Sequence, residues 1–387
     1  MFQRRFRSLV MLAFAIVVSA SVQTAFAATA VVGVIEYLSG DVSLTRAGTV
    51  MTNVDIGFSV ENFDLLKTGS DGEIIIALDK GTGFAGTMKI KPKSVFSVKT
   101  ESIKGVPATE GDLISGSIAV KETVAKAAKI AAVPTLRIRT TTTVMGVRGT
   151  EFDVALSIND SLLVGCSEGK VACTGEDGDE VEAVPGQTVT RSAGDRLKRV
   201  PVAVTRLETF KKEWIAEELS VFRADPLGAI DQYAKQYRRM KGEFTKAFDP
   251  LGRDEALSTW ASEHRRGTKV RANDIAVMKQ KSSLVPKLMA VRRVLFLFER
   301  VYYRLEDIRE QVGVGTLRSK PLSSGGTVAD FYKELDADKT GFEKKVAAYR
   351  FALRLFAERN EGRDVNSQMG DDDGGDFFDD TSSFFED

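Results

Sequence analysis

The chain has 387 residues, with 54 basic and 54 acidic side chains and 43% hydrophobic residues. This length accommodates two domains, and the apolar content is sufficient for two cores, which excludes a protein that is disordered throughout. Lysine and arginine are scattered and are not interleaved with aromatic residues, so we expect no nucleic-acid binding.

The first 27 residues have the pattern of a cleavable export signal. Three arginines within the first seven residues precede an apolar run over residues 9–20, and Ala25 and Ala27 occupy the two positions that a signal peptidase reads. An uncleaved membrane anchor is the alternative, but the run is shorter than the ~20 residues that span a bilayer. We predict an exported, periplasmic or envelope-located bacterial protein that begins at Ala28 after cleavage. No later segment is apolar enough to span a membrane.

Residues 28–201 consist of short β-rich runs separated by glycines, which predicts an all-β sandwich or roll. Examples are Val31 to Leu38, Glu73 to Leu78, Ser94 to Val98, Ser117 to Val120, Leu136 to Thr140 and Gln187 to Thr190. One exception is the stretch from Glu122 to Ala132, whose alanines and lysines fit either a helical turn or a surface loop.

A strand with period-two alternation follows Gly149. Phe152 and Val154 alternate with Glu151 and Asp153, as in a half-buried strand. Gly146 and Gly149 flank Arg148, which predicts a tight two-glycine turn before the strand. We interpret Arg148 as architectural, with its guanidinium bound to main-chain carbonyls or to a carboxylate.

Several segments in this β-rich part together resemble the FecR family of bacterial envelope domains over residues 30 to 200. The matching segments are Gly40-Asp41-Val42, Asp64 to Gly69, Asp71-Gly72-Glu73, Ser94 to Val98, the run from Gly146 to Val154, Glu168 to Val171, and Pro185-Gly186-Gln187. The resemblance makes Gly146, Arg148, Gly149, Thr150 and Phe152 a structural signature. In place of the family's usual Thr-Pro, this chain has a run of four threonines, Thr140 to Thr143. Well-known members relay an outer-membrane transport signal to a sigma factor, and this chain would share at most the sensing half.

Cys166 and Cys173 are the two cysteines of the chain. If Glu168-Gly169 or Gly169-Lys170 forms a two-residue hairpin turn, the two side chains lie on one face of the hairpin. Because an exported protein meets an oxidising compartment, we favour a disulfide. Two free buried thiols are the alternative.

Amphipathic helices are expected from 202 to 360, in a helical bundle. Leu207 to Phe222 form the first apolar face, and Asp225-Pro226 supplies an N-cap and a first-turn proline. A narrow seam from Ile230 to Ala247 suits packing against a neighbouring helix. The second copy of the Asp-Pro-Leu-Gly motif, Asp249 to Gly252, predicts a second cap.

A broad apolar face from about Leu284 to Ile308 predicts the central helix of the bundle, with contacts to two partners. The loop from Gly313 to Gly326 interrupts the pattern. The pattern resumes at Val328 and again after Thr340-Gly341. The aromatic stripes on these helices are expected to be core and not a ligand cage, because their spacing explains them.

Residues 361–387 form an acidic tail whose composition predicts disorder. The phenylalanine pairs at Phe377-Phe378 and Phe384-Phe385 suggest a short docking peptide, but a solvating tail is the favoured interpretation. The spacing of its aspartates does not resemble a calcium-binding loop.

No catalytic apparatus is recognisable in the sequence. The single histidine, His264, falls at the end of a short helix, so neither a triad base nor a histidine-rich metal site is expected. The glycines from Gly81 to Gly86 sit in a β-rich region with no following helix, unlike a nucleotide-binding loop. We expect no cofactor and no enzyme, although a carboxylate pair that converges in the fold stays open.

These patterns favour an exported, non-enzymatic protein of the bacterial cell envelope that binds a partner protein or glycan in sensing or scaffolding. The helices would set spacing or mediate oligomerisation. The alternatives are a polysaccharide-acting enzyme and a structural envelope protein that self-associates.

Overall fold

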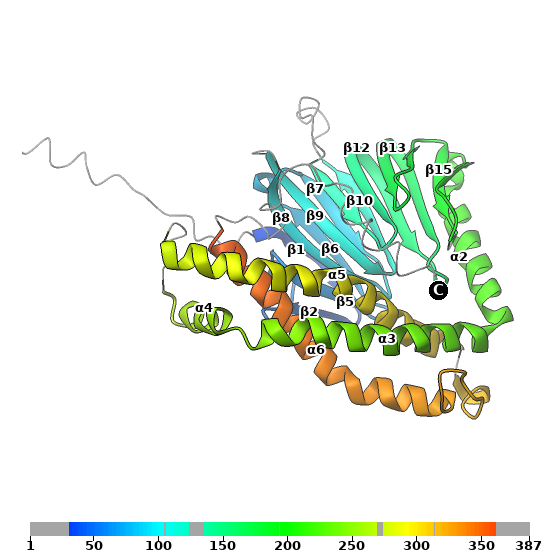
Figure 1. Ribbon diagram of the computed structural model, residues 1–387. Helices are drawn as coiled ribbons and strands as arrows, with labels where there is room; N and C mark the ends of the chain where they lie inside the picture. The colour runs from blue at the N-terminus through cyan, green and yellow to red at the C-terminus, as the bar shows by residue number, and fades with distance from the viewer. Residues whose placement is uncertain are drawn as a thin grey trace, which may run out of the picture.

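The computed structural model describes residues 31–103, 106–123, 135–192, 194–268, 274–312 and 314–360. Strands occupy the first part and helices the second, and the change falls between Pro201, where β16 ends, and Leu207, where α2 begins (Figure 1). The predicted β-rich unit followed by a helical unit is confirmed. The export signal, the acidic tail and most of the exceptional stretch from Glu122 to Ala132 lie outside the described residues.

The β-rich unit contains sixteen described strands. They are β1 (Val31–Ser39), β2 (Val42–Arg46), β3 (Thr49–Val50), β4 (Ser59–Glu61), β5 (Asp64–Thr68), β6 (Glu73–Leu78), β7 (Gly86–Ile90), β8 (Val95–Ile103), β9 (Val106–Ser115), β10 (Ser117–Glu122), β11 (Leu136–Arg139), β12 (Thr143–Leu156), β13 (Leu162–Gly175), β14 (Glu180–Ala183), β15 (Gln187–Arg191) and β16 (Lys198–Pro201). Inward positions alternate with outward ones, as in β6, where Ile74, Ile76 and Leu78 are buried.

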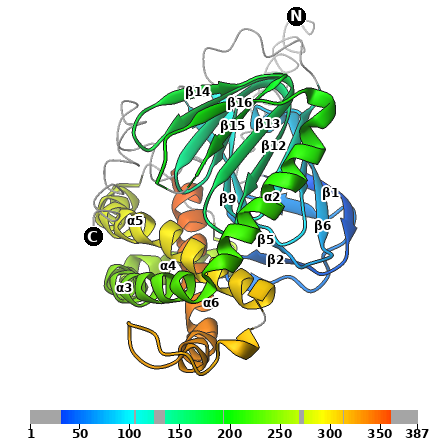
Figure 2. The same cartoon turned by 90° about the vertical axis from the view of Figure 1, so that its right-hand side faces the viewer.

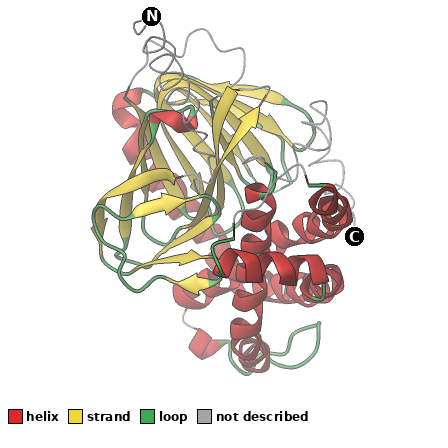
Figure 3. Cartoon of the chain, turned by 90° about the vertical axis from the view of Figure 1, so that its left-hand side faces the viewer, coloured by secondary structure: helices red, strands yellow, loops and turns green. Residues whose placement is uncertain are grey.

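All sixteen strands belong to one mixed sheet. Its main path runs β3-β2-β5-β8-β9-β11-β12-β10-β7-β6-β1-β4, and β13 leads from β12 to β14, β15 and β16. The pairs are antiparallel except β9 with β11. Strands β1 and β8 are far apart in this order, yet they contact each other, and Ile35 and Phe96 share one apolar core. The sheet therefore curls over its own core, which is the predicted roll (Figure 3).

The described part of the second unit contains five α-helices. They are α2 (Leu207–Ala224), α3 (Pro226–Gly252), α4 (Glu255–Arg265), α5 (Ile275–Val312) and α6 (Val328–Glu358). Helix α2 lies along the sheet beside β12 and β13, whereas α3 to α6 gather at one side of it (Figure 2). None of the described helices combines the length and apolarity that crossing a membrane requires.

The predicted caps are confirmed at one copy of the repeated motif and wrong at the other. The Asp225 carboxylate accepts a hydrogen bond from the Gly228 backbone N–H at 2.9 Å and begins α3. Pro250 lies inside α3, and the next cap is Asp254, which accepts from the backbone N–H of Ala256 and Leu257 and begins α4. The second motif comes at the end of α3, where the fold continues the helix past the proline.

Helix α5 is the central helix, as predicted, because it contacts α3, α4 and α6 as well as β9. Its aromatic side chains pack against those of its neighbours, with ring centroids 5.5 Å apart for Phe298 and Tyr237 and 4.8 Å apart for Phe298 and Phe342. The expectation that these stripes are core is confirmed. The helix begins at Ile275, nine residues before the predicted start. The prediction missed its first turns because they are exposed and carry no apolar stripe.

The sheet and the helices share part of one core. Phe63, Leu65, Val95 and Ile114 from the sheet belong to the apolar cluster that the helices form. Ion pairs also connect the β-rich unit to the helices. Examples are Arg354 Nη2 to Glu61 Oε2 at 2.6 Å, Lys93 Nζ to Glu310 Oε2 at 2.7 Å, Lys211 Nζ to Asp153 Oδ1 at 2.9 Å and Arg304 Nη2 to Asp160 Oδ1 at 3.0 Å. The two units are distinct in secondary structure but are packed as one body.

Candidate functional site

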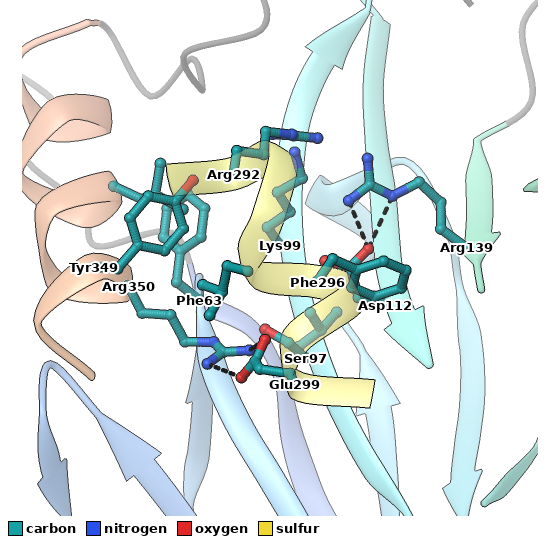
Figure 4. A pocket seen from close by; sticks show the side chains of 13 residues that line it. Phe63, Ser97, Lys99, Asp112, Arg139, Arg292, Phe296, Glu299, Tyr349 and Arg350 are labelled. Atoms are coloured by element: carbon teal, nitrogen blue, oxygen red, sulfur yellow. Dashed lines mark hydrogen bonds and ion pairs between the residues drawn. The ribbon is translucent and has the colours of Figure 1, made fainter. Parts of the chain in front are cut away.

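A recess lies where the sheet meets α5 and α6 (Figure 4). Its walls are unusually rich in charged side chains for a buried position. They are Lys99 from β8, Asp112 from β9, Arg139 from β11, Arg292 and Glu299 from α5, and Arg350 from α6. This recess is the candidate site, because buried charge marks functional sites more often than surface charge does.

Strand register explains why the sheet side of the recess is charged. Arg139 lies opposite Asp112 in the parallel β9–β11 pair, and its Nε and Nη2 donate to Asp112 Oδ1 at 2.8 and 2.7 Å. Lys99 lies opposite Glu110 in the antiparallel β8–β9 pair, with Nζ 3.3 Å from Glu110 Oε1. Glu110 and Asp112 are two residues apart on one strand, so they share a face of the sheet.

Glu110 is buried among cations. Burial alone would raise the pKa of its carboxyl, but the positive charges of Arg139, Lys99 and Arg292 together hold that pKa below its ordinary value. Arg139 Nε is 3.2 Å from Glu110 Oε1. Glu110 is therefore an ionised counter-charge for the sheet side of the recess.

Glu299 behaves in the opposite way on the helix side. Its side chain is 2% exposed, and Arg350 donates to both carboxylate oxygens, at 2.7 and 3.0 Å. Burial raises the pKa of Glu299 in spite of this fork-shaped contact. The pair joins α5 to α6 at the floor of the recess.

The size and charge of the recess limit what it can do. Its free volume is about 60 Å³, room for a few water molecules, whereas sites for organic ligands measure roughly 300 Å³ or more. Asp112 and Glu299 are each held by an arginine, so neither presents an unpaired carboxylate to a substrate. The arrangement suits a structural ion-pair network better than general acid-base catalysis.

The residues that carry the family resemblance lie away from this recess. Gly146 and Phe152 lie within β12, opposite Ala172 and Cys166 of β13, and Phe152 is buried. The predicted turn between Gly146 and Gly149 is wrong, because β12 runs unbroken from Thr143 to Leu156. Gly146 is paired in regular register, and the β12–β13 register shifts between Arg148 and Glu151, so Gly149 accompanies a local irregularity of the strand pairing and not a chain reversal. The side chains of residues 148–150 lie outside the description.

Three other segments of the resemblance meet at one corner of the sheet. The Gly69 N–H donates to the Asp41 carbonyl at 2.7 Å, and the Asp41 N–H donates to the Asp71 carboxylate at 3.1 Å. A Cβ on Gly72 would lie 2.0 Å from the Asp41 carbonyl oxygen, so only glycine fits there. These motif residues brace two turns against each other and have an architectural role.

The expected cysteine hairpin is wrong. Cys166 and Cys173 lie on one continuous strand, β13, opposite Phe152 and Met145 of β12. The disulfide is not formed, and both thiols are free and buried. Burial raises the pKa of Cys166 to about 11 and that of Cys173 to about 12, so neither is a reactive thiolate near neutral pH.

His264 and the acidic residues form no metal site in the part of the chain that the structure describes. His264 ends α4, as predicted, and its Nδ1 lies 3.1 Å from a Glu358 carboxylate oxygen. Its ring meets Phe351 edge-on, with centroids 5.4 Å apart. The histidine links α4 to α6.

Sequence reasoning missed every charged residue of the recess. Arg139 and Asp112 are 27 positions apart, and Glu299 and Arg350 are 51 apart, so no short motif contains either pair. A weak local signal exists in β9 and β11, where acidic residues at 110 and 112 and arginines at 137 and 139 recur with the period of a strand.

Comparisons with known proteins give little further guidance. No family model and no curated protein matches this chain. Two solved structures of a "putative anti-sigma factor" from Parabacteroides distasonis are similar to part of it. One has a TM-score of 0.29 at 12% identity and covers 38% of this chain and 63% of the other. The second has a TM-score of 0.22 at 14% identity, with coverages of 36% and 56%.

The matched part of this chain spans less than two thirds of either neighbour. At these TM-scores the similarity carries no argument about fold or function. Membership of the FecR family therefore stays a prediction from the residues quoted above.

Proposed function

We propose that this chain is an exported protein of a bacterial cell envelope that binds a partner protein or glycan and is not an enzyme. Its β-rich unit would be a FecR-like module, and its helical unit a rigid extension of that module. Two sequence features support this proposal: the export pattern of residues 1–27 and the ordered series of FecR-like segments.

The observation that carries the non-enzymatic part is the candidate site itself. A recess of about 60 Å³ whose carboxylates are held by arginines has no room for a sugar ring or a peptide. A second recess, beside Asp307, measures about 180 Å³ and is also smaller than the roughly 300 Å³ of sites for organic ligands. Recognition would then use the outer surface of the body. The shared core of the sheet and the helices fixes that surface in one shape.

The first experiment tests export. The full-length chain is expressed in a Gram-negative bacterium, the cells are fractionated, and the N-terminus of the protein is read by mass spectrometry. We expect an envelope fraction that begins at Ala28, and we expect Ala27→Asp to block the cleavage because the peptidase requires a small residue there. Intact Met1 in the cytosolic fraction would refute the proposal.

The second experiment tests binding against the alternatives. Crosslinking in intact cells followed by mass spectrometry of the full chain is expected to recover a repeatable envelope partner. Full length is required, because removing residues 202–360 would expose Phe63, Leu65, Val95 and Ile114. Release of sugars from cell-wall polysaccharide by the purified protein would favour an enzyme. Crosslinks exclusively between copies, with a multimer in light scattering, would favour a self-associating structural protein.

A further inference from the structure

The last described residue of the chain lies against the beginning of α5. Lys281 Nζ is 3.4 Å from Asn360 Oδ1. The end of α6 also contacts α4, because Arg359 Nη2 donates to Glu263 Oε2 at 2.8 Å and His264 meets Glu358. In Figure 1 the red end of α6 lies beside the yellow beginning of α5. The acidic segment 361–387 therefore leaves the described fold where α4, α5 and α6 meet.

This exit point is strongly basic. From Ile275 to Phe298, helix α5 has no acidic residue and five basic ones, which are Lys279, Lys281, Lys287, Arg292 and Arg293. Helix α4 ends nearby with exposed Arg265, followed by Arg266. Within the described residues, Arg265 and Lys279 form no ion pair, although both are exposed. Lys287 is paired with Asp254, Arg292 lines the recess, and exposed Asp274 precedes Ile275. The exposed cations at the exit point are therefore Arg265, Arg266 and Lys279, with Lys281 beside them, and they outnumber this one exposed carboxylate.

The same place also exposes large apolar side chains. Ile275 is 72% exposed and Met278 is 53% exposed on the first turns of α5. Single exposed apolar residues are ordinary, but here two are adjacent in a helix turn and lie next to Lys279. The surface formed by Arg265, Arg266, Ile275, Met278, Lys279 and Lys281 is named the exit surface below.

The segment that begins at this surface has the complementary chemistry. Residues 361–387 contain ten acidic residues and one basic residue, a net charge of −9. They also contain the pair Phe377-Phe378, flanked by Asp376 and Asp379, and the pair Phe384-Phe385, followed by Glu386 and Asp387. Phenylalanine packs favourably on methionine sulfur and on aliphatic side chains. Charge and apolar character therefore both match the exit surface.

We propose that residues 361–387 fold back and bind the exit surface of the same molecule. The carboxylates would face Arg265, Lys279 and Lys281, and one phenylalanine pair would cover Ile275 and Met278. Sixteen residues separate Asn360 from Phe377 and span up to roughly 50 Å when extended, so reach is not limiting. The tether raises the local concentration of the tail to roughly the millimolar range, which favours this intramolecular contact over a second molecule. The proposal does not depend on the envelope function.

The test uses carbodiimide, which joins carboxylates to lysines without a spacer, on an equimolar mixture of ¹⁵N-labelled and unlabelled full-length chain. We expect crosslinks from residues 371–387 to Lys279 and Lys281 that carry a single isotope label. They should weaken in about 0.5 M salt, because exposed charges are screened. Lys212, exposed on α2, is the internal control and should receive none. Tail crosslinks mostly to Lys212 or to other lysines, or with mixed labels, would overturn the proposal.

Charge reversal provides the second measurement. Arg265→Glu combined with Lys279→Glu should lower the yield of tail crosslinks to Lys281 at least roughly threefold, since each exposed pair contributes a fraction of a kcal/mol. Lys212→Glu should leave it unchanged. Replacing Asp371, Asp372 and Asp373 by lysine in the doubly reversed chain should restore the yield from the remaining tail carboxylates. Unchanged crosslinking in the doubly reversed chain, with an unchanged circular dichroism spectrum, would refute the proposal.

Discussion

Helix α5 packs against α3 on one side and against the sheet on another, and the two contacts are built differently. Toward α3 the contact is aromatic and apolar, with Phe298, Tyr237 and Phe244 fully buried. On the side of α5 that faces the sheet and α6, apolar residues are joined by buried charges. Examples are Arg304 with Asp160, in the turn between β12 and β13, and Glu299 with Arg350 of α6. Helix α5 is therefore held to α3 by shape, and to the sheet and α6 by shape plus charge.

The difference bears on how the two units are positioned. Apolar side chains tolerate small shifts, because any nearby apolar surface excludes water from them. A buried charge has no such freedom, since a charge that loses its partner costs several kcal/mol. The charged contacts add little net stability to the packing of the sheet against the helices. They raise the free energy of every other arrangement of the two units, because a buried charge would then lose its partner. They would fix a single arrangement of the sheet and the helices, which a binding surface that spans both units requires.

The largest expected effect comes from breaking the Glu299–Arg350 pair at one end. Arg350→Ala leaves Glu299 buried and unpaired, so we expect the free energy of unfolding to fall by about 3–5 kcal/mol. Replacing both, as Glu299→Leu with Arg350→Met, removes both charges and keeps the volume. We expect this double variant to lie within about 2 kcal/mol of the wild type. Urea denaturation followed by circular dichroism measures both.

The matched control for this prediction lies on the aromatic side of the same helix. Phe298→Leu keeps the site apolar and leaves no stranded charge, so its cost should be below about 1.5 kcal/mol if the neighbours repack. If Arg350→Ala cost no more than Phe298→Leu, the proposed contrast between the two contacts would be wrong. A double variant as unstable as Arg350→Ala would show that the pair contributes by itself and not merely by avoiding an unpaired charge.

A smaller effect concerns Asp307, which lines a second recess between α5, α2 and the sheet. Burial raises the pKa of Asp307 to about 6, and Arg304, whose Nη1 is 3.7 Å away, offsets this only in part. The folded state therefore holds this proton to a higher pH than the unfolded chain does. The contribution of protonated Asp307 to the free energy of unfolding is complete below about pH 4 and is lost as the pH rises through 6.

Asp307→Asn should remove that loss, because asparagine stays neutral. The gain in unfolding free energy over the wild type is expected to be on the order of 1 kcal/mol at pH 7 and near zero at pH 4. Chemical denaturation at pH 4, 5, 6 and 7 measures it. Glu213→Gln, at a side chain of α2 that is 61% exposed, is the control and should change little. A gain of equal size at pH 4 and pH 7 would exclude the titration of Asp307 as its cause.

The sequence predicted the order of the two units and the core faces, and the reason is periodicity. In Glu73 to Leu78 the buried side chains alternate along the strand, and from Ile230 to Phe244 they recur every three or four residues along the helix. The spacing of apolar residues therefore identifies the strand and the helix from the local sequence. The first turns of α5 were missed because exposed helix carries no apolar period. Its start at Ile275 depends on Asp274, which accepts a hydrogen bond from the Ala276 backbone N–H at 2.8 Å.

The candidate site could not be predicted, because it is made by long-range pairing. The curl of the sheet and the placement of α5 on β9 bring Glu110, Arg139 and Arg292 together from three distant segments. The cysteine hairpin failed for a related reason. Gly169 has a φ of +75°, as in a turn, but β12 pairs with β13 from end to end and holds it as one strand, so tertiary pairing overrode the local turn signal.

The repeated Asp-Pro-Leu-Gly motif gives the smallest and most closely matched test of context over local pattern. Asp225 caps α3 through the Gly228 N–H, whereas Asp249 lies within the same helix, with only Arg253 at 3.8 Å as an ion-pair partner. Asp225→Ala should lower the free energy of unfolding by about 1 kcal/mol, the usual value of an N-cap. Asp249→Ala should change it by less than about 0.5 kcal/mol, because alanine favours the helix and the exposed pair contributes little. Thermal and urea unfolding of the two variants side by side measure the difference. Equal losses at both positions would mean that Asp249 also caps the N-terminus of a helix in solution, as the sequence pattern suggested and the structure contradicts.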